Sequence, residues 1–295
     1  MKISELLKSK RYSLSFEVFP PKTYSNFESV KSSTEENAKL SPSFMSVTYG
    51  AGGGTSEYTL AIAKNIKEQY GVPSIAHLTC ISSTKQTVES MIHSFKDAGI
   101  ENIMALRGDI PKERINDDRT LWDYRHAVDL ITDIKRIDPG FCIGGAAYPE
   151  IHPESKNQRE DIKYLKQKVD AGCDFLTTQM FFDNNLLYNF LYKIREAGIT
   201  VPVIAGIMPI TSANQVKRSI ELSGSFMPRR FLSLLDAFGD SPDAMKQAGI
   251  AYATDQIIDL YANGITHVHV YSMNKPDVAA KINQNLSRIL GKKVL

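Results

Sequence analysis

Charged and polar side chains stand at the ends of several short apolar segments, and they are the candidates for chemistry. Glu17 lies within the run Ser15-Phe16-Glu17-Val18-Phe19, where poor solvation favours the neutral carboxylic acid and raises its pKa. A carboxyl group with a raised pKa suits general acid catalysis near neutral pH. The structural alternative is a glutamate paired with a Lys or Arg of another strand.

Arg107 and Asp109 flank Gly108 at the end of another apolar segment. A charged pair around a glycine has little structural purpose there, and an internal salt bridge between the two side chains is the alternative. His77 stands alone in a third segment, without a second histidine at the spacing of metal ligands. The pattern therefore predicts no metal site.

Further features are suited to holding a ligand. The glycine-rich stretch 50–54 exposes backbone N–H groups that would hold an anion or admit a flat ligand, although a plain strand-to-helix turn is an equal alternative. The remaining polar candidates are Tyr148, His152, Asp161, Tyr164, Lys168, Gln179, Gln215 and Lys275. They include no Ser/His/Asp triad and no phosphate loop, a pattern typical of redox chemistry by a bound cofactor.

The elements that must position these residues alternate between strand and helix patterns. Short β-rich runs bounded by Gly or Pro predict strands over 14–19, 44–50, 74–80, 102–109, 142–148, 175–182, 202–208 and 267–273. Helical spacing between them predicts helices over 56–69, 84–98, 121–137, 158–171, 186–197 and 213–222. Such alternation is typical of parallel βαβ units.

Even spacing of the eight predicted strands favours an α/β fold, a closed (β/α)8 TIM barrel, over an open doubly wound sheet. The interval 225–255 is irregular, and residues 226–238 predict an extra helix before strand eight. Without a long linker or an internal repeat, residues 1–295 are expected to form a single domain. In such a barrel the carboxyl ends of the strands carry the catalytic groups.

Composition excludes several classes of function. Apolar residues make up 42% of the chain and charged residues 23%, with a net charge of +2, so neither a disordered chain nor a nucleic-acid partner is expected. The three cysteines are widely spaced and match no disulfide framework. No stretch is apolar enough for a membrane span or a signal peptide, and we expect a cytoplasmic protein.

Six segments at successive strand ends together resemble the methylenetetrahydrofolate reductase family in its short bacterial, FAD-dependent form. They are SFEVFPP (15–21), SVTYGAGG (46–53), AHLTC (76–80), ALRGD (105–109), YPEIHP (148–153) and TQMFFD (178–183). The similarity runs in order over nearly the whole chain. It implies an oxidoreductase in which FAD passes a hydride from NADH or NADPH to 5,10-methylenetetrahydrofolate in a ping-pong reaction, giving 5-methyltetrahydrofolate for methionine biosynthesis and one-carbon metabolism.

The resemblance also implies roles for individual residues. Glu17 would be the general acid and Asp109 a second catalytic residue near pterin and flavin, while Gln179, Gln215 and Lys275 would bind folate, with Gln179 also near the nicotinamide. The implied FAD contacts are Thr48, Tyr49, Ala51, His77, Arg107, Gly108, Asp109, Ala127, Tyr148, His152, Asp161 and Lys168. A homo-oligomer is expected from the family's habit and from exposed apolar helices.

Three positions depart from the family pattern. Lys275 stands where an arginine often contacts folate, His126 where a tyrosine commonly precedes the alanine, and Ser219 where an aromatic ring can stack on substrate. Lysine lacks the planar fork of arginine, which bears on folate affinity. The longer eukaryotic members carry a C-terminal regulatory domain that binds S-adenosylmethionine, and we expect that regulation to be absent here.

Other functions stay open on the residues alone. A proline-dehydrogenase-like flavin barrel would bind FAD and oxidise an amino acid, but the Glu17 and Gln179 segments argue against it. A Schiff-base aldolase would use Lys275 as its nucleophile. A non-catalytic folate- or flavin-binding barrel is the third alternative, and the sequence does not distinguish NADH from NADPH.

Overall fold

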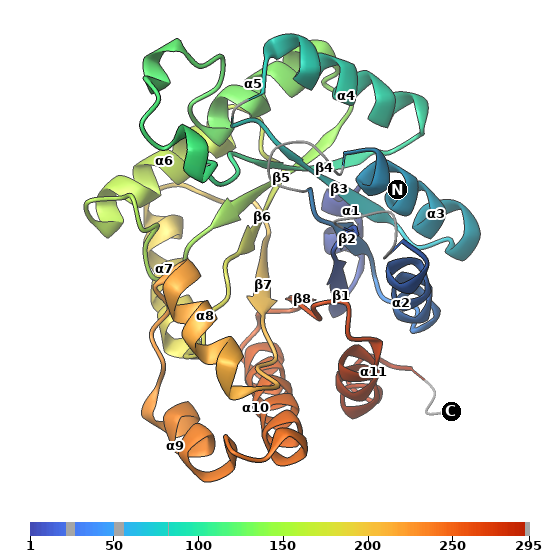
Figure 1. Ribbon diagram of the computed structural model, residues 1–295, viewed down its shortest axis with the longest axis vertical. Helices are drawn as coiled ribbons and strands as arrows, with labels where there is room; N and C mark the ends of the chain where they lie inside the picture. The colour runs from blue at the N-terminus through green and yellow to red at the C-terminus, as the bar shows by residue number, and fades with distance from the viewer. Residues whose placement is uncertain (22–26, 50–55, 82, 293–295) are drawn as a thin grey trace.

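The computed structural model describes residues 1–21, 27–49, 56–81 and 83–292. Eight parallel strands close into one barrel in the order β1 to β8 (Figure 1). They are β1 (Ser13–Val18), β2 (Met45–Val47), β3 (Ser74–Thr79), β4 (Asn102–Leu106), β5 (Cys142–Ala147), β6 (Phe175–Thr178), β7 (Val203–Ile207) and β8 (His267–Val270). This confirms the predicted (β/α)8 barrel.

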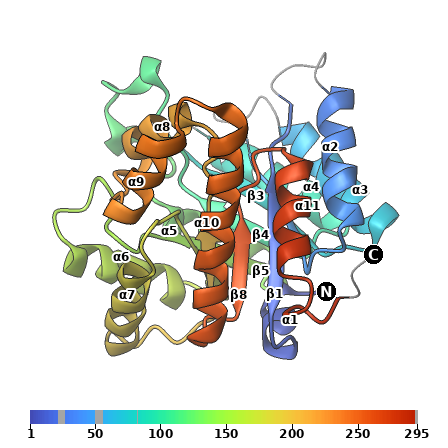
Figure 2. The ribbon, with the colours of Figure 1, turned by 90° about the horizontal axis from the view of Figure 1, so that it is seen from below.

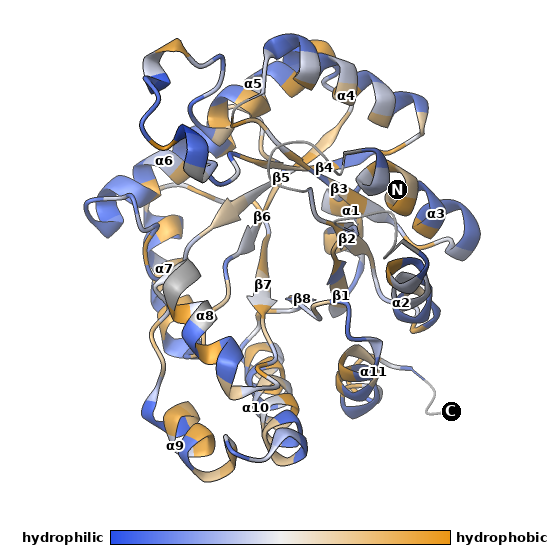
Figure 3. Cartoon of the chain, in the orientation of Figure 1, coloured by the Kyte–Doolittle hydropathy of each residue, from blue (hydrophilic) through white to orange (hydrophobic). Residues whose placement is uncertain are grey.

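The helices surround the barrel. They are α1 (Ile3–Ser9), α2 (Phe27–Lys39), α3 (Ser56–Tyr70), α4 (Lys85–Asp97), α5 (Ala127–Ile137), α6 (Gln158–Asp170), α7 (Asn184–Glu196), α8 (Ala213–Ser223), α9 (Arg229–Phe238), α10 (Pro242–Ala262) and α11 (Pro276–Asn285), with short 3₁₀ turns η2 (Lys112–Arg114) and η3 (Arg119–Leu121). Hydrophilic residues gather on the helix sides that face away from the strands (Figure 3).

Two predicted helix starts were wrong. The helix predicted from 121 begins at Ala127, because the Asp129 carboxylate accepts hydrogen bonds from the backbone N–H groups of Arg125 and His126 and caps the helix there. The extra helix predicted from 226 begins at Arg229. Pro228 occupies its N-cap in an extended conformation, and a proline disfavours helical geometry in the residue before it.

Predicted strands end up to four residues too late, as at β6, predicted to residue 182 but ending at Thr178. Met180, Phe181 and Phe182 beyond Thr178 are still apolar and buried, so the pattern of a strand continues after the ladder has stopped. They pack instead under α9 and α10, where Phe182 contacts Phe231 at a centroid distance of 5.6 Å. The chain therefore leaves the barrel after Thr178, and the residues that follow pack against α9 and α10.

Helix α1 covers the amino-terminal end of the barrel. Its buried residues Ile3, Leu6 and Leu7 belong to the same apolar cluster as Phe44 and Phe175 of the barrel. The Ile3 N–H donates to Asn102 Oδ1 at the start of β4, and Figure 2 shows α1 at the end where β1 begins. Because this end is filled, the carboxyl ends of the strands are left for ligands.

Helix α10 lies closely against the segment after β7. A Cβ atom added at Gly249 would lie 1.7 Å from the carbonyl oxygen of Ile210, a distance that backbone atoms cannot tolerate. Ile210 is itself buried in the apolar cluster that joins α8, α9 and α10 to the ends of β6 and β7. A glycine at position 249 is therefore a packing requirement.

We expect Gly249→Ala to lower the free energy of unfolding by roughly 1–3 kcal/mol, the usual cost of overpacking, despite alanine's better helix propensity. Urea unfolding followed by circular dichroism measures it. The control is Gln247→Ala, which places an alanine at an exposed position of the same helix and should change stability by at most about 0.5 kcal/mol. Equal midpoints for wild type and Gly249→Ala would contradict this packing argument.

Candidate active site

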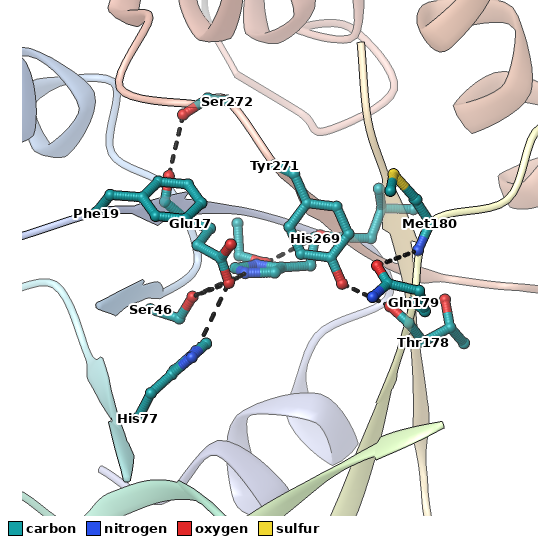
Figure 4. A network of polar contacts seen from close by, with 12 residues as sticks. Glu17, Phe19, Ser46, His77, Thr178, Gln179, Met180, His269, Tyr271 and Ser272 are labelled. Atoms are coloured by element: carbon teal, nitrogen blue, oxygen red, sulfur yellow. Dashed lines mark hydrogen bonds and ion pairs between the residues drawn. The ribbon is translucent and has the colours of Figure 1, made fainter. Parts of the chain in front are cut away.

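A carboxyl group lies buried inside the barrel near the carboxyl end of β1. Glu17 is only 8% exposed, and strand register places it beside Ser46 of β2. Its Oε2 atom lies 3.4 Å from Ser46 Oγ, 3.6 Å from His77 Nε2 and 3.9 Å from His269 Nε2 (Figure 4). Among the described residues, no lysine or arginine pairs with this carboxylate, so the alternative of a Lys or Arg partner from another strand is wrong.

Burial controls the protonation of this cluster. Burial raises the pKa of Glu17 from 4.5 to about 8, against a smaller opposite effect of the Ser46 hydrogen bond. Burial also lowers the pKa of His77 and of His269 to about 3. At neutral pH the carboxyl group is thus mostly protonated and both imidazoles are uncharged, which is the state required of a general acid.

A chain of hydrogen bonds through Ser15, His269 and Ser46 lies next to the Glu17 carboxyl group. His269 Nδ1 lies 2.8 Å from Ser15 Oγ, and its Nε2 lies 2.9 Å from Ser46 Oγ. The register of β1 with β8 pairs Ser15 with His269, so neighbouring strands aim these side chains at one another. Because the single hydroxyl proton of Ser46 cannot serve His269 and Glu17 at once, the longer contact to Glu17 stabilises the carboxylate weakly.

One buried nitrogen in this cluster has no hydrogen-bond partner within the part of the chain that the structure describes. It is His77 Nε2, and the strand that carries it neighbours β4, which leads into Arg107. An orphaned buried polar atom is costly, so a ligand heteroatom at this position would satisfy it.

Tyr271 lies between Glu17 and the segment after β6 (Figure 4). Its hydroxyl donates to the Thr178 carbonyl oxygen at 2.5 Å, and burial raises its pKa well above the ordinary value, with further contributions from the charges of Glu17 and Tyr148. Gly206 makes this contact possible, because a Cβ atom there would lie 2.2 Å from the Thr178 carbonyl and 2.5 Å from the Tyr271 hydroxyl.

Gln179 follows directly on this contact. Its side-chain Oε1 accepts from the Met180 N–H at 2.9 Å, and its amide N–H₂ group has no hydrogen-bond partner in the part of the chain that the structure describes. In Figure 4 the Gln179 side chain points toward Tyr271. Both residues come from the carboxyl ends of strands, as the barrel prediction required.

A second group of polar side chains surrounds Arg107, after β4. The Arg107 guanidinium forms a two-pronged ion pair with Glu154, at 2.5 and 3.0 Å, so the predicted alternative of a salt bridge to Asp109 is wrong. Asp109 is exposed. The Tyr148 ring contacts His152 edge-on at a centroid distance of 4.6 Å.

Electrostatic interactions tie this second group to the first. Burial raises the pKa of the Tyr148 hydroxyl, Arg107 lowers it, and Asp109, Asp161 and Glu154 raise it further. The Tyr148 charge also contributes to raising the pKa of Tyr271, which lies beside Glu17. The barrel therefore brings the predicted residues of β1, β4, β5 and β8 to one end.

Asp161 and Lys168 of α6 form hydrogen bonds with the neighbouring loop and strand. Asp161 accepts hydrogen bonds from the His152 N–H at 3.2 Å and from Ser155 Oγ at 3.1 Å. Lys168 Nζ donates to the Ala146 carbonyl oxygen, and burial lowers its pKa. Both residues shape the segment after β5 that carries Tyr148 and Glu154.

The other predicted cofactor contacts lie directly after strands or at the start of a helix. Thr48 and Tyr49 are half-buried directly after β2, Gly108 follows Arg107 with a φ of 87°, and Ala127 is the first residue of α5. The prediction for Ala51, and the glycine-rich stretch 50–54 around it, lie outside the described residues.

The predicted folate contacts Gln215 and Lys275 meet at Thr211. Gln215 Oε1 accepts from the Thr211 N–H and hydroxyl at 2.7 and 2.9 Å, and Lys275 Nζ donates to Thr211 Oγ1 at 2.7 Å. Ser219, where the family pattern allows a stacking ring, is only 3% exposed and contacts Met208 Sδ at 3.7 Å. His126 is exposed and stacks on Tyr164.

Several polar residues of the site were not assigned a role from sequence. Ser15, Ser46, His269 and Tyr271 line the barrel interior, and Glu154 pairs with Arg107. The alternation of Ser13, Ser15 and Glu17 in one strand and of His267, His269 and Tyr271 in another is the available signal, because residues two apart point to the same face.

The described residues contain neither a metal-binding cluster nor a membrane-spanning helix. Within residues 1–21, 27–49, 56–81 and 83–292, no group of three or more His, Cys, Asp and Glu side chains is arranged to hold a metal ion. No helix in these same ranges combines the length and apolar character needed to cross a bilayer.

The fold and these residues define a barrel enzyme with a neutral carboxylic acid at the carboxyl end of its strands. A sequence model of the family "Methylenetetrahydrofolate reductase" matches residues 2–287. The chain belongs to the methylenetetrahydrofolate reductase family. It is an oxidoreductase, and the family's reaction is the reduction of methylenetetrahydrofolate to methyltetrahydrofolate, which confirms the resemblance drawn from the six segments.

Individual relatives agree with this membership. The chain is 34% identical to 5,10-methylenetetrahydrofolate reductase of Pectobacterium carotovorum, over 94% of this chain and 90% of the relative. The Escherichia coli K12 enzyme of that name is also 34% identical, over 92% and 90%. The maize protein "Methylenetetrahydrofolate reductase (NADH) 1" is 33% identical over 99% of this chain, which spans 51% of that relative.

A solved structure confirms the fold. It is an uncharacterized Clostridium thermocellum protein described as binding two copies of 5-methyl-5,6,7,8-tetrahydrofolic acid. It superposes with a TM-score of 0.67 at 13% identity, covering 98% of this chain and 100% of the other.

The raised pKa of Glu17 predicts a pH-dependent loss of stability. Between pH 4.5 and about 8 the unfolded chain ionises this carboxyl while the folded protein keeps it protonated, so stability falls as pH rises, by up to about 1.4 kcal/mol per pH unit. Glu17→Gln removes this loss. We expect melting temperatures of variant and wild type to agree near pH 4 and to diverge toward pH 8, with the variant more stable.

The matched control is Glu89→Gln, at an exposed position of α4, which should follow the wild-type profile throughout. A constant difference between Glu17→Gln and wild type from pH 4 to 8 would mean that Glu17 titrates normally in the folded protein.

Proposed function

We propose that the protein is an FAD-dependent reductase that uses NADH or NADPH to reduce 5,10-methylenetetrahydrofolate in a ping-pong reaction. The observation that carries this proposal is the neutral Glu17 carboxyl, buried without a cationic partner among the described residues, at the carboxyl end of a barrel of this family. The names of the bacterial relatives support the substrate, and the name of the maize relative supports NADH.

The residues present fit a flavin dinucleotide. Its diphosphate is anionic, and Arg107 presents a half-buried guanidinium fork of the kind that binds phosphate. The orphaned His77 Nε2 offers a hydrogen bond to a ring heteroatom. Thr48, Tyr49, Gly108, Asp109, Ala127, Tyr148, His152, Asp161 and Lys168 complete the proposed contacts, together with Ala51.

A bound flavin supplies a carrier that accepts hydride from the nicotinamide nucleotide and later delivers it to the folate carbon. Glu17 protonates the ring nitrogen of the substrate that leaves the methylene carbon. The C–N bond breaks with its electron pair on that protonated nitrogen, and the resulting iminium carbon accepts the hydride. A carboxyl with a pKa of about 8 holds the needed proton at neutral pH, and Ser46 and His269 position it.

Substrate contacts follow from the strand ends. Asp109 is an exposed carboxylate beside Arg107, where it binds the pterin ring and stabilises the cation that develops on ring opening. Gln179 offers its amide to the pterin and the nicotinamide. Gln215 and Lys275, joined through Thr211, bind the folate farther out, and lysine supplies a point charge in place of an arginine fork.

The biological setting is part of the same proposal. We place the enzyme in cytoplasmic one-carbon and methionine metabolism, as a single catalytic domain over residues 1–295 and as a homo-oligomer. Exposed apolar side chains on α8, α9 and α10, namely Ile220, Leu232, Phe238 and Ile258, are candidates for a subunit contact.

The test separates the two half-reactions. In wild type, NADH added without oxygen should bleach the flavin absorbance, and methylenetetrahydrofolate should restore it. Glu17→Gln should keep the bleaching by NADH but slow the folate step by at least about a hundredfold, the usual size of general acid catalysis, because only that step needs the proton. Anaerobic stopped-flow absorbance measures both rates.

Glu89→Gln serves again as the charge-matched control and should keep both steps. Folate reduction at the wild-type rate in Glu17→Gln would overturn the role of the acid. A colourless protein that cannot be reconstituted with FAD would overturn the cofactor.

A further inference from the structure

One backbone carbonyl assigns the direction of every hydrogen bond in the chain next to Glu17. The hydroxyl of Ser15 lies 3.0 Å from the carbonyl oxygen of Val268. A carbonyl oxygen only accepts hydrogen bonds, so the single proton of the Ser15 hydroxyl points to Val268. The Nδ1 atom of His269, which lies 2.8 Å from Ser15 Oγ, is therefore the donor in that contact. His269 thus carries its ring proton on Nδ1.

This tautomer of His269 also fixes the hydroxyl of Ser46. Burial lowers the pKa of His269 to about 3, so the ring is neutral and its Nε2 atom has a lone pair instead of a proton. Ser46 Oγ lies 2.9 Å from that nitrogen and must donate its proton to it (Figure 4). The oxygen lone pairs of Ser46, and not its proton, then face Glu17 Oε2 at 3.4 Å.

The orientation of the Ser46 hydroxyl decides which form of Glu17 is favoured. A hydroxyl that donates to a carboxylate stabilises the ionised form, and a hydrogen bond from Ser46 acts in this direction by lowering the pKa of Glu17. A hydroxyl whose lone pairs face the carboxyl group instead accepts a proton from the neutral acid. His269 competes with Glu17 for the one proton of Ser46, and its contact is the shorter of the two.

The other titratable groups around Glu17 do not contact the Ser46 hydroxyl within the described part of the chain. Strands β2 and β7 carry no ionisable side chain. His77 of β3 lies 3.6 Å from Glu17 Oε2 without forming a hydrogen bond, and burial keeps it neutral. Tyr271 of β8 donates to the Thr178 carbonyl, and Tyr148 after β5 contributes to raising the pKa of Tyr271. The competition for the Ser46 proton is therefore between His269 and Glu17.

Ring packing holds His269 in place independently of these hydrogen bonds. Its ring stacks on Phe44 at a centroid distance of 5.6 Å and an interplanar angle of 11°. The Tyr271 ring meets it edge-on at 5.6 Å and 87°, and strand register places Gly206 of β7 beside it. An apolar aromatic ring at position 269 keeps this packing and loses only the polar atoms, which makes His269→Phe a suitable probe.

A second serine–histidine pair joins the same two strands and serves as a comparison. Ser13 of β1 and His267 of β8 are paired in register, with Ser13 Oγ 3.0 Å from His267 Nδ1. A hydrogen bond to the backbone of Leu7 in α1 acts on the pKa of His267, so this pair belongs to the amino-terminal end of the barrel. No carboxylate of the described residues pairs with it, which leaves Glu17 to the pair that reaches Ser46.

We propose that His269 is a positioning residue for the general acid, which holds the Ser46 hydroxyl proton away from Glu17 so that the acid keeps its own proton at neutral pH. His269 acts through Ser46 and touches no reacting atom in this role. The inference rests on the proposed function in that Glu17 is the acid of the folate step. Without His269, the Ser46 hydroxyl turns to Glu17 and stabilises the carboxylate.

The first test measures the titration of Glu17 itself and needs neither flavin nor folate. Protein labelled with ¹³C at the glutamate carboxyl groups is titrated by NMR, and Glu17→Gln identifies the Glu17 signal by its loss. In wild type this signal should titrate at a pKa of about 8. In His269→Phe the titration should move down by roughly one pH unit, because the released Ser46 hydroxyl donates to the carboxylate.

Two further variants separate positioning from a structural role of His269. Adding Ser46→Ala to His269→Phe removes the released hydroxyl and should return the Glu17 titration at least to the wild-type pH, as a double-mutant cycle measures. A merely structural loss would not be repaired by deleting a second polar group. His269→Gln offers an amide oxygen that accepts from Ser46, and its Glu17 should titrate close to wild type.

The pH profile of the folate step should follow the same pattern. A general acid needs its proton, so the rate falls as pH rises through the pKa of Glu17. In His269→Phe this fall should begin roughly one pH unit lower, and the step should be roughly tenfold slower than in wild type at high pH. Bleaching by NADH should be unchanged, because it does not need this proton. Anaerobic stopped-flow absorbance measures both steps.

His267→Phe is the matched control, since it makes the same change in the other serine–histidine pair, and it should leave the Glu17 titration unchanged. Circular dichroism melting checks that each variant is folded. Equal Glu17 titrations in wild type and His269→Phe would overturn the positioning role alone, as would a shift that persists after Ser46→Ala is added. A wild-type Glu17 that titrates near its ordinary pKa of 4.5 would overturn the acid of the proposed function as well.

Discussion

Burial of the Glu17 carboxyl without a neighbouring cation is the constraint on which the site depends. The polar atoms of described residues within reach of its Oε2 belong to Ser46, His77 and His269. Since burial also keeps the two imidazoles neutral, no cationic side chain among the described residues compensates a negative charge there, and only the Ser46 hydroxyl opposes the rise in pKa. The same environment that would destabilise a carboxylate makes the group an acid at neutral pH.

The rest of the fold maintains this environment. Helix α1 fills the amino-terminal end of the barrel with the apolar side chains of Ile3, Leu6 and Leu7. Close backbone contacts at Gly206 and Gly249 hold the ends of β6 and β7 against Tyr271 and α10. These contacts put rigid elements around Tyr271 beside Glu17, next to the loops that follow β4 and β5.

The regions around Glu17 and around Arg107 differ in their electrostatics. Around Glu17, charge is removed by desolvation, which prepares one proton for transfer. Around Arg107, charge is kept and balanced by Glu154, whose side chain is half exposed, so that water screens the interaction.

The sequence by itself determined the architecture and the acid. Period-two apolar runs between helical segments are a local property, so the eight strands and most helices were predictable, and Glu17 sits in an apolar run wherever that run folds. Partners depend on register between strands and on loops that meet in space. Only the tertiary structure therefore decided that Ser46 and His269 flank Glu17, that Glu154 rather than Asp109 pairs with Arg107, and that α5 starts at Ala127.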